Sequence, residues 1–422
     1  MNTFARSNTM SAAGFAARVH CAPAPARCGA RAGRCAARVV RADAPASRDA
    51  APAHVAAPGS AAEALPRRAL LAGTVSGALL ATLPVRNAEA EAAPPPLDGV
   101  GRTVVLTGCN TGIGYDAAGK LAARGFNVVM ACRTAAKAEG AASSLRAAAA
   151  AAGTPLAGLL EPAECDLASL ASVRAFAASF AASGRPLHLL CLNAGLQFSG
   201  DDTVRRTADG FEITVGTNHL GHFLLANLLL PSLEKAGKGA RVVVTASEVH
   251  DPASPGGAVG PGATLGDLSG LAQKGAAFEM IDGSPYNADK AYKDSKLCNL
   301  LFTRELARRL KAAGSPVEVV AFGPGLITRT GFFRNQNKVF TALFDFATND
   351  IFHVAESVSG GGDCLVASAT RQGLESGTYL NNDLDGRGGH RFEAQPPSKE
   401  AQNDEEAARL WALSAQLVGL PA

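Results

Sequence analysis

The chain has 422 residues and a formal net charge of +3, from 40 Lys and Arg against 37 Asp and Glu. The positive charge is confined to the first hundred residues, which contain 11 Arg, no Lys and six acids, whereas the rest is slightly acidic. A chain without a broad basic surface is not expected to bind nucleic acid as its main activity. With 47% hydrophobic residues, the larger part has enough apolar chain for one substantial core, which excludes a disordered protein.

Nine Cys residues are spread along the chain without a C-x-x-C pair or a Cys/His cluster of zinc spacing. We therefore expect buried thiols in a reducing compartment and no bound metal. His219 and His222 are spaced like a metal pair on a helix. Because no third ligand is evident, helix packing is the favoured interpretation of both.

Residues 1–92 are predicted to be a plastid targeting region. Seven Arg precede the first acid in a stretch rich in Ala, Ser, Gly and Pro, which is typical of an organelle transit peptide. Arg67 and Arg68 then precede an apolar run over 69–83 and small residues at 88–92, as in a twin-arginine thylakoid signal. A single longer transit peptide, or an extension without a targeting role, are the alternatives. The predicted location is the chloroplast, associated with the thylakoid on its stromal or lumenal side.

From Gly101 onward, short β-branched or apolar runs alternate with amphipathic stretches of helical length, which is typical of a parallel sheet with crossover helices. Residues 93–422 are therefore predicted to form a single α/β domain, a Rossmann-type doubly wound parallel sheet of about seven strands with helices on both faces. The predicted strands are 103–106, 127–131, 164–166, 187–192, 241–245, 317–322 and 378–380. The predicted helices begin near Gly112, Ala135, Leu170, Gly210, Tyr292 and Val354, and a last one covers 404–417.

The first predicted strand runs into a glycine-rich segment, Thr107-Gly108-Cys109-Asn110-Thr111-Gly112-Ile113-Gly114. Glycines here let the chain turn tightly and let backbone N–H groups approach a pyrophosphate at the N-terminus of the following helix. A place between a strand and a helix is the context that a dinucleotide-binding motif requires. The candidate cofactor-binding residues of this segment are therefore Gly108, Asn110, Thr111, Gly112, Ile113 and Gly114.

The end of the second predicted strand indicates which dinucleotide binds. An acid there would bind the ribose hydroxyls of NAD, whereas this chain has Arg133, whose guanidinium suits a 2′-phosphate. The predicted cofactor is NADPH, and an ordinary solvated Arg133 is the alternative. Asp166, at the end of the third predicted strand, is placed to receive the adenine amino group. Asn193, Ala194 and Gly195 end the fourth strand at the sheet edge where ligands bind.

Tyr292 and Lys296 form a Tyr-x-x-x-Lys pair on one helix face. An ammonium beside a phenol favours the phenolate and lowers the phenol pKa, so Tyr292 could exchange a proton near neutral pH. Ser247, at the end of the fifth predicted strand, can hydrogen-bond the reacting oxygen or the tyrosine. Asn218, within a long helix, can hold a water that continues the proton path. These four residues are the candidate catalytic group.

The order of glycine loop, Asn-Ala-Gly, Asn, Ser, Tyr-x-x-x-Lys and Pro-Gly resembles the short-chain dehydrogenase/reductase superfamily over 101–380. The resemblance implies hydride transfer between a nicotinamide and a small-molecule substrate, with the four candidate catalytic residues as a tetrad. It also implies that Pro324 and Gly325 lie beside the nicotinamide and that Thr328 contacts the cofactor.

Within the superfamily, the second half of the chain resembles the light-dependent protochlorophyllide reductases. The segments that carry this resemblance are Met280 to Gly283, Ala291 to Asn299, Thr330 to Arg334, Ser398 to Ala401 and Gln416 to Leu420. The resemblance implies a plastid enzyme of chlorophyll synthesis, with peripheral membrane association. In that family the pigment absorbs light, NADPH gives a hydride to one carbon of the C17=C18 bond of protochlorophyllide, and a proton is delivered to the other carbon of that bond. It further implies a lid over about 323–352 in which Phe332 and Phe333 contact the flat substrate; core filling is the alternative for both.

One segment departs from the family pattern. The family usually has Tyr-Pro-Gly-Cys where this chain has Gly323-Pro324-Gly325-Leu326, and a leucine cannot donate a proton as that cysteine could. The tryptophans usual before the C-terminal tail are replaced by Tyr379-Leu380-Asn381-Asn382. Two other functions therefore stay open: a plastid carbonyl or alcohol reductase, like the retinol dehydrogenases, acting in the dark on an apolar substrate, and a non-catalytic pigment- or NADPH-binding protein. No motif indicates an oligomeric state.

Overall fold

The computed structural model describes residues 95–198, 200–327, 355–384 and 389–421. The predicted targeting region 1–92 lies outside the described residues, as do Thr328, Phe332 and Phe333 of the predicted lid. The strands are β1 Thr103–Thr107, β2 Asn127–Cys132, β3 Leu160–Glu164, β4 Leu189–Leu192, β5 Arg241–Thr245, β6 Glu318–Gly323, β7 Tyr379–Leu384 and β8 His390–Ala394.

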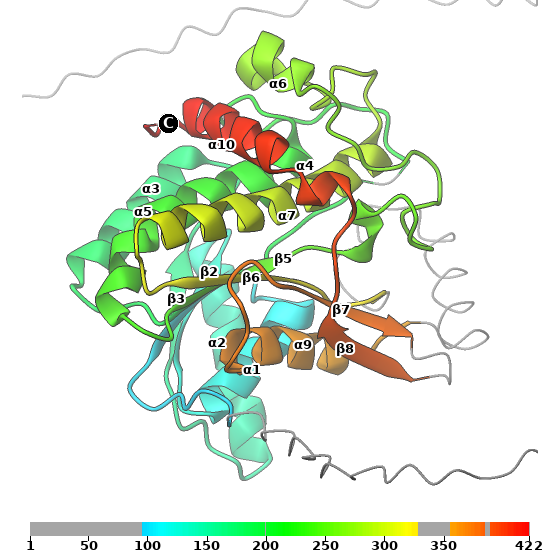
Figure 1. Ribbon diagram of the computed structural model, residues 1–422. Helices are drawn as coiled ribbons and strands as arrows, with labels where there is room; N and C mark the ends of the chain where they lie inside the picture. Colours follow the sequence, from blue (N-terminus) through cyan, green and yellow to red (C-terminus); the bar gives the residue numbers. More distant parts are fainter. Residues whose placement is uncertain (1–94, 199, 328–354, 385–388, 422) are drawn as a thin grey trace, which may run out of the picture. The chain divides into compact units, whose positions relative to one another are not determined.

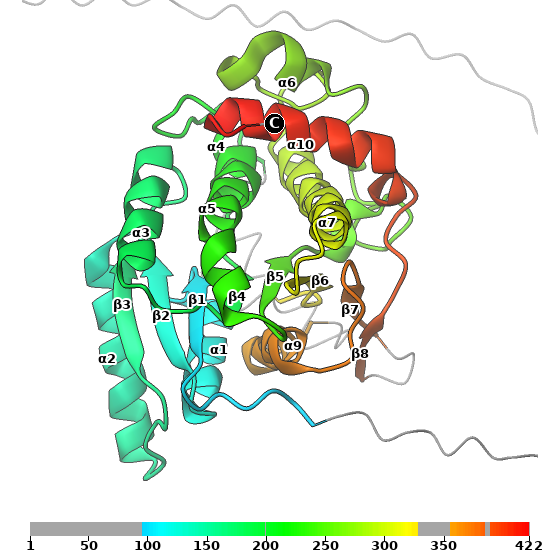
Figure 2. The same ribbon diagram turned by 60° about the vertical axis from the view of Figure 1, so that its left-hand side comes forward.

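These strands form one sheet (Figure 1), and their order, which can be followed in Figure 2, is β3-β2-β1-β4-β5-β6-β7-β8. Each pair from β3 to β7 is parallel, whereas β8 runs antiparallel to β7. The strand order changes direction between β1 and β4, and ligands bind outside the carboxyl ends of the strands at such a switch point. The predicted doubly wound parallel sheet is confirmed.

The two strands at the edges of the sheet depart most from the prediction, and β7 also ends at Leu384, four residues beyond its predicted end. The third strand spans Leu160–Glu164 rather than 164–166, so Asp166 lies in the turn beyond it. It contains Pro162 and two glutamates, a composition that is tolerated in an edge strand. Because it lacks an apolar run, the sequence pattern did not indicate a strand at these residues. The last strand, β8, was not predicted because most of its side chains are exposed and show no apolar alternation.

The helices pack on both faces of this sheet. Their bounds are α1 Gly112–Ala123, α2 Ala135–Ala151, α3 Leu170–Ala182, α4 Ile213–Val215, α5 Gly221–Ala236, α6 Ser269–Lys274, α7 Ala288–Ala312, α9 Val358–Thr370 and α10 Asp404–Val418. A π-helical turn, Gly216–Leu220, joins α4 to α5, and short 3-10 turns cover Glu248–His250, Gly275–Ala277 and Glu400–Gln402. None of the helices in the described residues is long and apolar enough to span a lipid bilayer.

Capping side chains explain where several helices begin. The first three long helices begin at the predicted residues. By contrast, α7 begins at Ala288, four residues before the predicted start, because the Asn287 side chain accepts the Lys290 N–H at 2.9 Å. Likewise, α9 begins at Val358 because Ser357 caps the Gly360 N–H at 2.8 Å. Such caps place the functional side chains of α7 by fixing the first turn of the helix.

The sheet separates two apolar layers (Figure 2). Val105 of β1 faces the layer of α3, α5, α7 and α10, whereas Val104 and Leu106 face the layer of α1, α2 and α9. Successive strand residues point to opposite faces, so a strand covered on both faces must be apolar throughout. On the first face, Trp411 of α10 stacks on Phe302 of α7 with ring centroids 5.8 Å apart. The C-terminal helix is therefore part of the core.

Candidate active site

A large cleft follows the carboxyl ends of the strands. The described residues line a cavity of about 1790 Å³, more than the ~300–1,000 Å³ usual for one small-molecule site. The predicted site residues that line it are Gly108, Asn110, Thr111, Gly112, Ile113, Gly114, Arg133, Asp166, Asn193, Ala194, Gly195, Ser247, Tyr292, Lys296, Pro324 and Gly325. Asn218 lies behind the lining and is fully buried. The cleft has room for a dinucleotide together with a second ligand.

The glycine loop is shaped by close backbone contacts. Gly108 has a φ of +66°, and a Cβ there would lie 2.7 Å from the Ala194 Cα. A Cβ at Gly114 would lie 2.6 Å from the Gly108 carbonyl oxygen. Within the described residues, the Thr111 side chain caps none of the first N–H groups of α1. These N–H groups and the helix dipole therefore remain available to an anion in the cleft.

Thr107, the last residue of β1, ties the glycine loop to the end of β4. Its Oγ1 accepts the N–H groups of Asn193 and Ala194 at 2.9 and 3.0 Å and lies 2.9 Å from His222 Nε2. His222 Nδ1 lies 3.0 Å from the Asn218 carbonyl oxygen, which can only accept, so Nδ1 carries the proton and Nε2 accepts the Thr107 hydroxyl. Burial lowers the pKa of His222 to about 3, which keeps the ring neutral. The sequence analysis missed the role of Thr107. The available signal was the four-residue spacing of Asn218 and His222, which places His222 on the same helix face as a predicted site residue.

His219 also makes its contacts inside the domain. Its Nε2 lies 2.9 Å from Ser414 Oγ of α10, and burial lowers its pKa to about 4. Both histidines thus have hydrogen-bond partners inside the domain, His222 at the end of β1 and His219 on α10. In the described parts of the chain, no group of three or more His, Cys, Asp or Glu residues is arranged to hold a metal ion.

Arg133 and Asp166 meet at one end of the cleft. Arg133 Nε lies 3.9 Å from Asp166 Oδ1, and the two side chains are 49% and 34% exposed. Lys137, in the first turn of α2, lines the same part of the cleft. Asp166 Oδ1 also accepts the Ala168 N–H at 3.0 Å. The half-exposed guanidinium therefore lines the cleft, and Lys137 adds a second cation to the lining.

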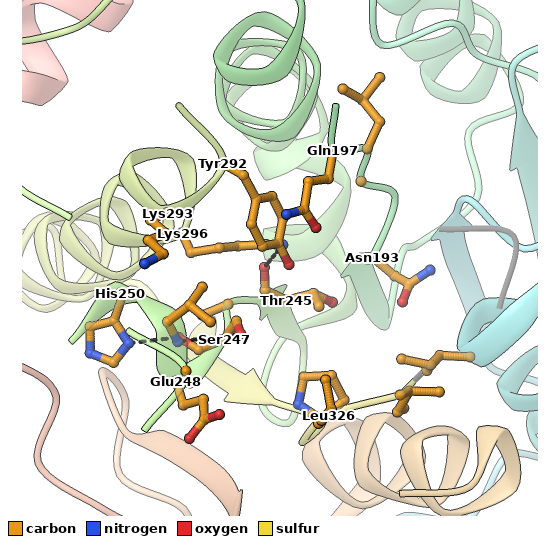
Figure 3. Close-up of a pocket in the computed structure, with 18 of the residues that line it drawn as sticks. Asn193, Gln197, Thr245, Ser247, Glu248, His250, Tyr292, Lys293, Lys296 and Leu326 are labelled. Atoms are coloured by element: carbon orange, nitrogen blue, oxygen red, sulfur yellow. Dashed lines mark hydrogen bonds between the residues drawn. The ribbon is translucent and has the colours of Figure 1, made fainter. Parts of the chain in front are cut away.

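Tyr292 and Lys296 extend from the first turns of α7 into the centre of the cleft (Figure 3). Tyr292 hydrogen-bonds Ser247. Lys296 Nζ lies 5.4 Å from the centroid of the Tyr292 ring and donates to the Thr245 carbonyl at 3.2 Å. Behind Ser247, His250 Nδ1 lies 2.7 Å from the Ser247 carbonyl oxygen. Three of the four predicted catalytic side chains are thus brought together in the cleft.

The acid–base properties of this group differ from the prediction. Burial raises the pKa of Tyr292 and the hydrogen bond to Ser247 lowers it, and burial prevails. Burial also lowers the pKa of Lys296 to about 8. The predicted lowering of the Tyr292 pKa is therefore wrong for the protein alone, because desolvation disfavours both the phenolate and the ammonium. At neutral pH, Tyr292 is a protonated donor and Lys296 is largely charged.

Asn218 lies in the π-helical turn between α4 and α5, a feature common at functional sites. Its Oδ1 accepts the Leu196 N–H at 2.9 Å, and its Nδ2 donates to the Leu196 carbonyl at 3.0 Å and to Ser295 Oγ at 3.1 Å. It therefore joins the segment after β4 to the helix that carries Tyr292. Its role in holding a water stays a prediction.

The comparisons with known proteins point to one family. Residues 102–259 match the short chain dehydrogenase family. A protochlorophyllide reductase of Chlamydomonas reinhardtii is 41% identical over 327 residues, which cover 76% of this chain and 79% of that protein. One of Marchantia paleacea is 39% identical over 325 residues, covering 75% and 68%. The chain belongs to the short-chain dehydrogenase/reductase family. The crystal structure of a Mycobacterium paratuberculosis protein, 32% identical, shares the fold with a TM-score of 0.55 and covers 78% of this chain and 97% of that one.

A short-chain dehydrogenase/reductase is an oxidoreductase with a nicotinamide cofactor, and the residues present fit such a group. A Cβ at Gly108 would collide with Ala194, and one at Gly114 with the Gly108 carbonyl, so glycine at both positions permits the tight turn on which a pyrophosphate can be held. The free N–H groups of α1 provide its anion site. The cleft extends from this loop to Tyr292 and Lys296, so one dinucleotide can reach both ends.

The segment after β6 in this oxidoreductase is held by β7. Asn382 Nδ2 donates to the Pro324 carbonyl and to Glu356 Oε2, both at 3.1 Å. A Cβ at Gly323 would lie 2.6 Å from the Tyr379 hydroxyl. The sequence analysis missed Asn382 because it lies far from Pro324 along the chain. The glycine that departs from the family pattern is thus explained by the hydrogen-bonded side chains of Tyr379 and Asn381 packed against it.

Proposed function

We propose that the protein is a chloroplast NADPH-dependent protochlorophyllide reductase that works by light. The observation that carries this proposal is the similarity to proteins named chloroplastic protochlorophyllide reductase over three quarters of the chain, at 41% identity in the case of Chlamydomonas reinhardtii. A cavity of about 1790 Å³, larger than a dinucleotide alone needs, supports a second, bulky ligand.

The proposed cofactor contacts follow from the arrangement of the cleft. Bound NADPH would supply the hydride. The glycine loop and the first turn of α1 would hold the pyrophosphate, and Arg133 with Lys137 the 2′-phosphate. Asp166, Thr328 and the segment Pro324–Gly325 are proposed as further contacts to the cofactor.

Proton delivery is assigned to Tyr292. Leu326 lines the cleft but has no proton to give. Tyr292 keeps its proton at neutral pH because burial raises its pKa, and Ser247 and Lys296 lie beside it. In this proposal, Lys296 orients the cofactor and the phenol, and Phe332 and Phe333 contact the pigment.

The location of the protein is also part of the proposal. The names of the relatives place those proteins in chloroplasts, and the Arg-rich residues 1–92 support a plastid address for this chain. Peripheral contact with the thylakoid is proposed from the family resemblance. Import of the full chain into isolated chloroplasts, followed by fractionation, separates stromal from lumenal protein.

The test of the function is a flash experiment with the full chain, NADPH and protochlorophyllide mixed in darkness. A red shift of pigment absorption on mixing and chlorophyllide formation only after the flash are expected. Omitting NADPH is the control and must prevent conversion. Pigment binding without conversion would instead identify a binding protein, and dark reduction of apolar aldehydes or ketones would identify a carbonyl reductase.

Arg133→Asp is expected to weaken NADPH binding about tenfold or more while leaving NADH binding nearly unchanged. A hydrogen bond to a charged group contributes about 1.5–3 kcal/mol, and each 1.4 kcal/mol is a factor of ten. Dissociation constants of both nucleotides by fluorescence titration measure the preference. Lys238→Asp makes the same charge change at an exposed lysine outside the cleft and should change neither value. An unchanged NADPH affinity in Arg133→Asp would remove Arg133 from the cofactor site.

A further inference from the structure

A loop rich in proline and glycine forms one wall of the cleft. It spans residues 251–262, between the 3-10 turn after β5 and helix α6, and we call it the wall loop. Its residues that line the cleft include Ser254, Pro255, Gly256, Val259, Gly260 and Pro261. Val259 is 72% exposed although it is apolar. The wall loop therefore presents an apolar side chain at the rim of the cavity.

A single ammonium group holds this loop. Lys293 Nζ donates to the carbonyl oxygens of Gly257 at 2.9 Å, Val259 at 2.6 Å and Pro261 at 3.0 Å. A lysine ammonium has three N–H donors, so all three are used by the wall loop. The Lys293 residue is buried, with 6% exposure. Because no carboxylate in the described residues lies within ion-pair distance of it, these carbonyl groups are what compensates its buried charge.

The second half of the wall loop depends on this contact. In the first half, Ser254 Oγ donates to the Glu248 carbonyl at 2.8 Å and accepts the Gly257 N–H at 2.9 Å. For residues 259–262, the hydrogen bonds within the described chain are those that Lys293 makes to Val259 and Pro261. Gly260 has a φ of +68°, which glycine adopts as readily as a negative φ, so its backbone alone does not fix the loop in this conformation. Without the ammonium, this half would be free to move.

Lys293 also directly follows Tyr292 in α7, and the two side chains leave the helix in different directions (Figure 3). One turn of helix thus carries both the proton donor and the anchor of the wall. We propose that Lys293 is a positioning residue that fixes the wall loop at the distance from Tyr292 which admits a broad apolar ring system. This inference deepens the proposed function and rests on it for the identity of the substrate.

Lys293→Met keeps the length of the side chain and removes its donors. With the full chain, the KM for protochlorophyllide is expected to rise about tenfold, whereas kcat stays within about threefold and the NADPH dissociation constant within about twofold. Amide hydrogen exchange at Gly257 and Ala258, whose N–H groups bond Ser254, should accelerate. Lys238→Met, at an exposed lysine outside the cleft, is the matched control. An unchanged KM, or a loss of NADPH affinity as large as the rise in KM, would overturn the inference.

A second variant covers the case in which Lys293→Met folds poorly. Val259→Ser changes an exposed side chain, so the fold should persist, and the KM for the pigment is expected to rise about threefold or more. Val100→Ser is its control, because Val100 is 74% exposed and lies outside the cleft. If the wild-type protein does not bind the pigment, the proposed function fails by itself. Hydrogen exchange still tests the contact of Lys293 with the wall loop, and wild-type exchange rates at Gly257 and Ala258 in Lys293→Met would refute it.

Discussion

Lys296→Met is expected to lower kcat/KM for NADPH-dependent reduction by about a hundredfold or more, since positioned groups that support proton transfer contribute about 10²–10⁴-fold. The ammonium lies 5.4 Å from the Tyr292 ring centroid and is held by the Thr245 carbonyl. Methionine fills a similar volume without the charge or the donors. Initial rates after calibrated flashes, at saturating and limiting NADPH, measure the loss. Wild-type rates in this variant would exclude Lys296 from the mechanism.

The same residue predicts a pH dependence. Burial lowers the pKa of Lys296 to about 8, so kcat/KM of the wild type should fall as the pH rises through about 8 and the ammonium is lost. For stability the sign is opposite. Between about pH 8 and the usual lysine pKa, the unfolded chain binds the proton that the folded chain has lost, so this group's destabilising effect shrinks as the pH rises. Lys296→Met should therefore be more stable than the wild type at pH 7, by an amount that diminishes above pH 8 in denaturant titrations.

Gly108→Ala is expected to lower the free energy of unfolding by about 2–5 kcal/mol, from left-handed backbone strain of ~1–2 kcal/mol and overpacking of ~1–3 kcal/mol. The added Cβ would lie 2.7 Å from the Ala194 Cα, on a backbone with a φ of +66°. Relief of this contact must move the glycine loop away from the end of β4. The dissociation constant of NADPH is therefore expected to rise at least about tenfold, measured by fluorescence titration alongside thermal unfolding.

Gly153→Ala separates the two contributions to this effect. Gly153 has a φ of +67°, and a Cβ there would meet nothing within 4 Å. It should therefore show the backbone strain alone and leave NADPH binding unchanged. Equal losses of stability in the two variants would show that contact with Ala194 contributes nothing.

The parts of the site that the sequence could predict are those whose functional residues lie close together along the chain. The glycine loop follows its strand directly, and Tyr292 and Lys296 share one helix turn. Such neighbours can be placed from local backbone geometry alone, because the repeats of strand and helix determine which side chains share a face. The buried parallel strands were also predictable, because strands covered on both faces must be apolar throughout.

The remaining features depend on contacts between distant segments. The pKa of Tyr292 is raised because the folded chain removes the phenol from water, and no local pattern reports that burial. The amide of Asn218 binds Leu196, and that of Asn382 binds Pro324, across gaps in the sequence. The edge strand with Pro162 has no apolar run to detect. Tertiary structure, rather than residue type, decides what these groups do.

The contact between Gly323 and Tyr379 restricts how this cleft could have diverged from its relatives. A side chain at position 323 would clash with the phenol at position 379, since a Cβ at Gly323 would lie 2.6 Å from the Tyr379 hydroxyl. A chain with a bulky residue at 323 must therefore acquire glycine there before it can accept tyrosine at 379. The reverse order passes through an overpacked intermediate. The order of these changes is therefore constrained, and a bulky residue at 323 is expected to destabilise the fold as long as Tyr379 and Asn381 keep their side chains.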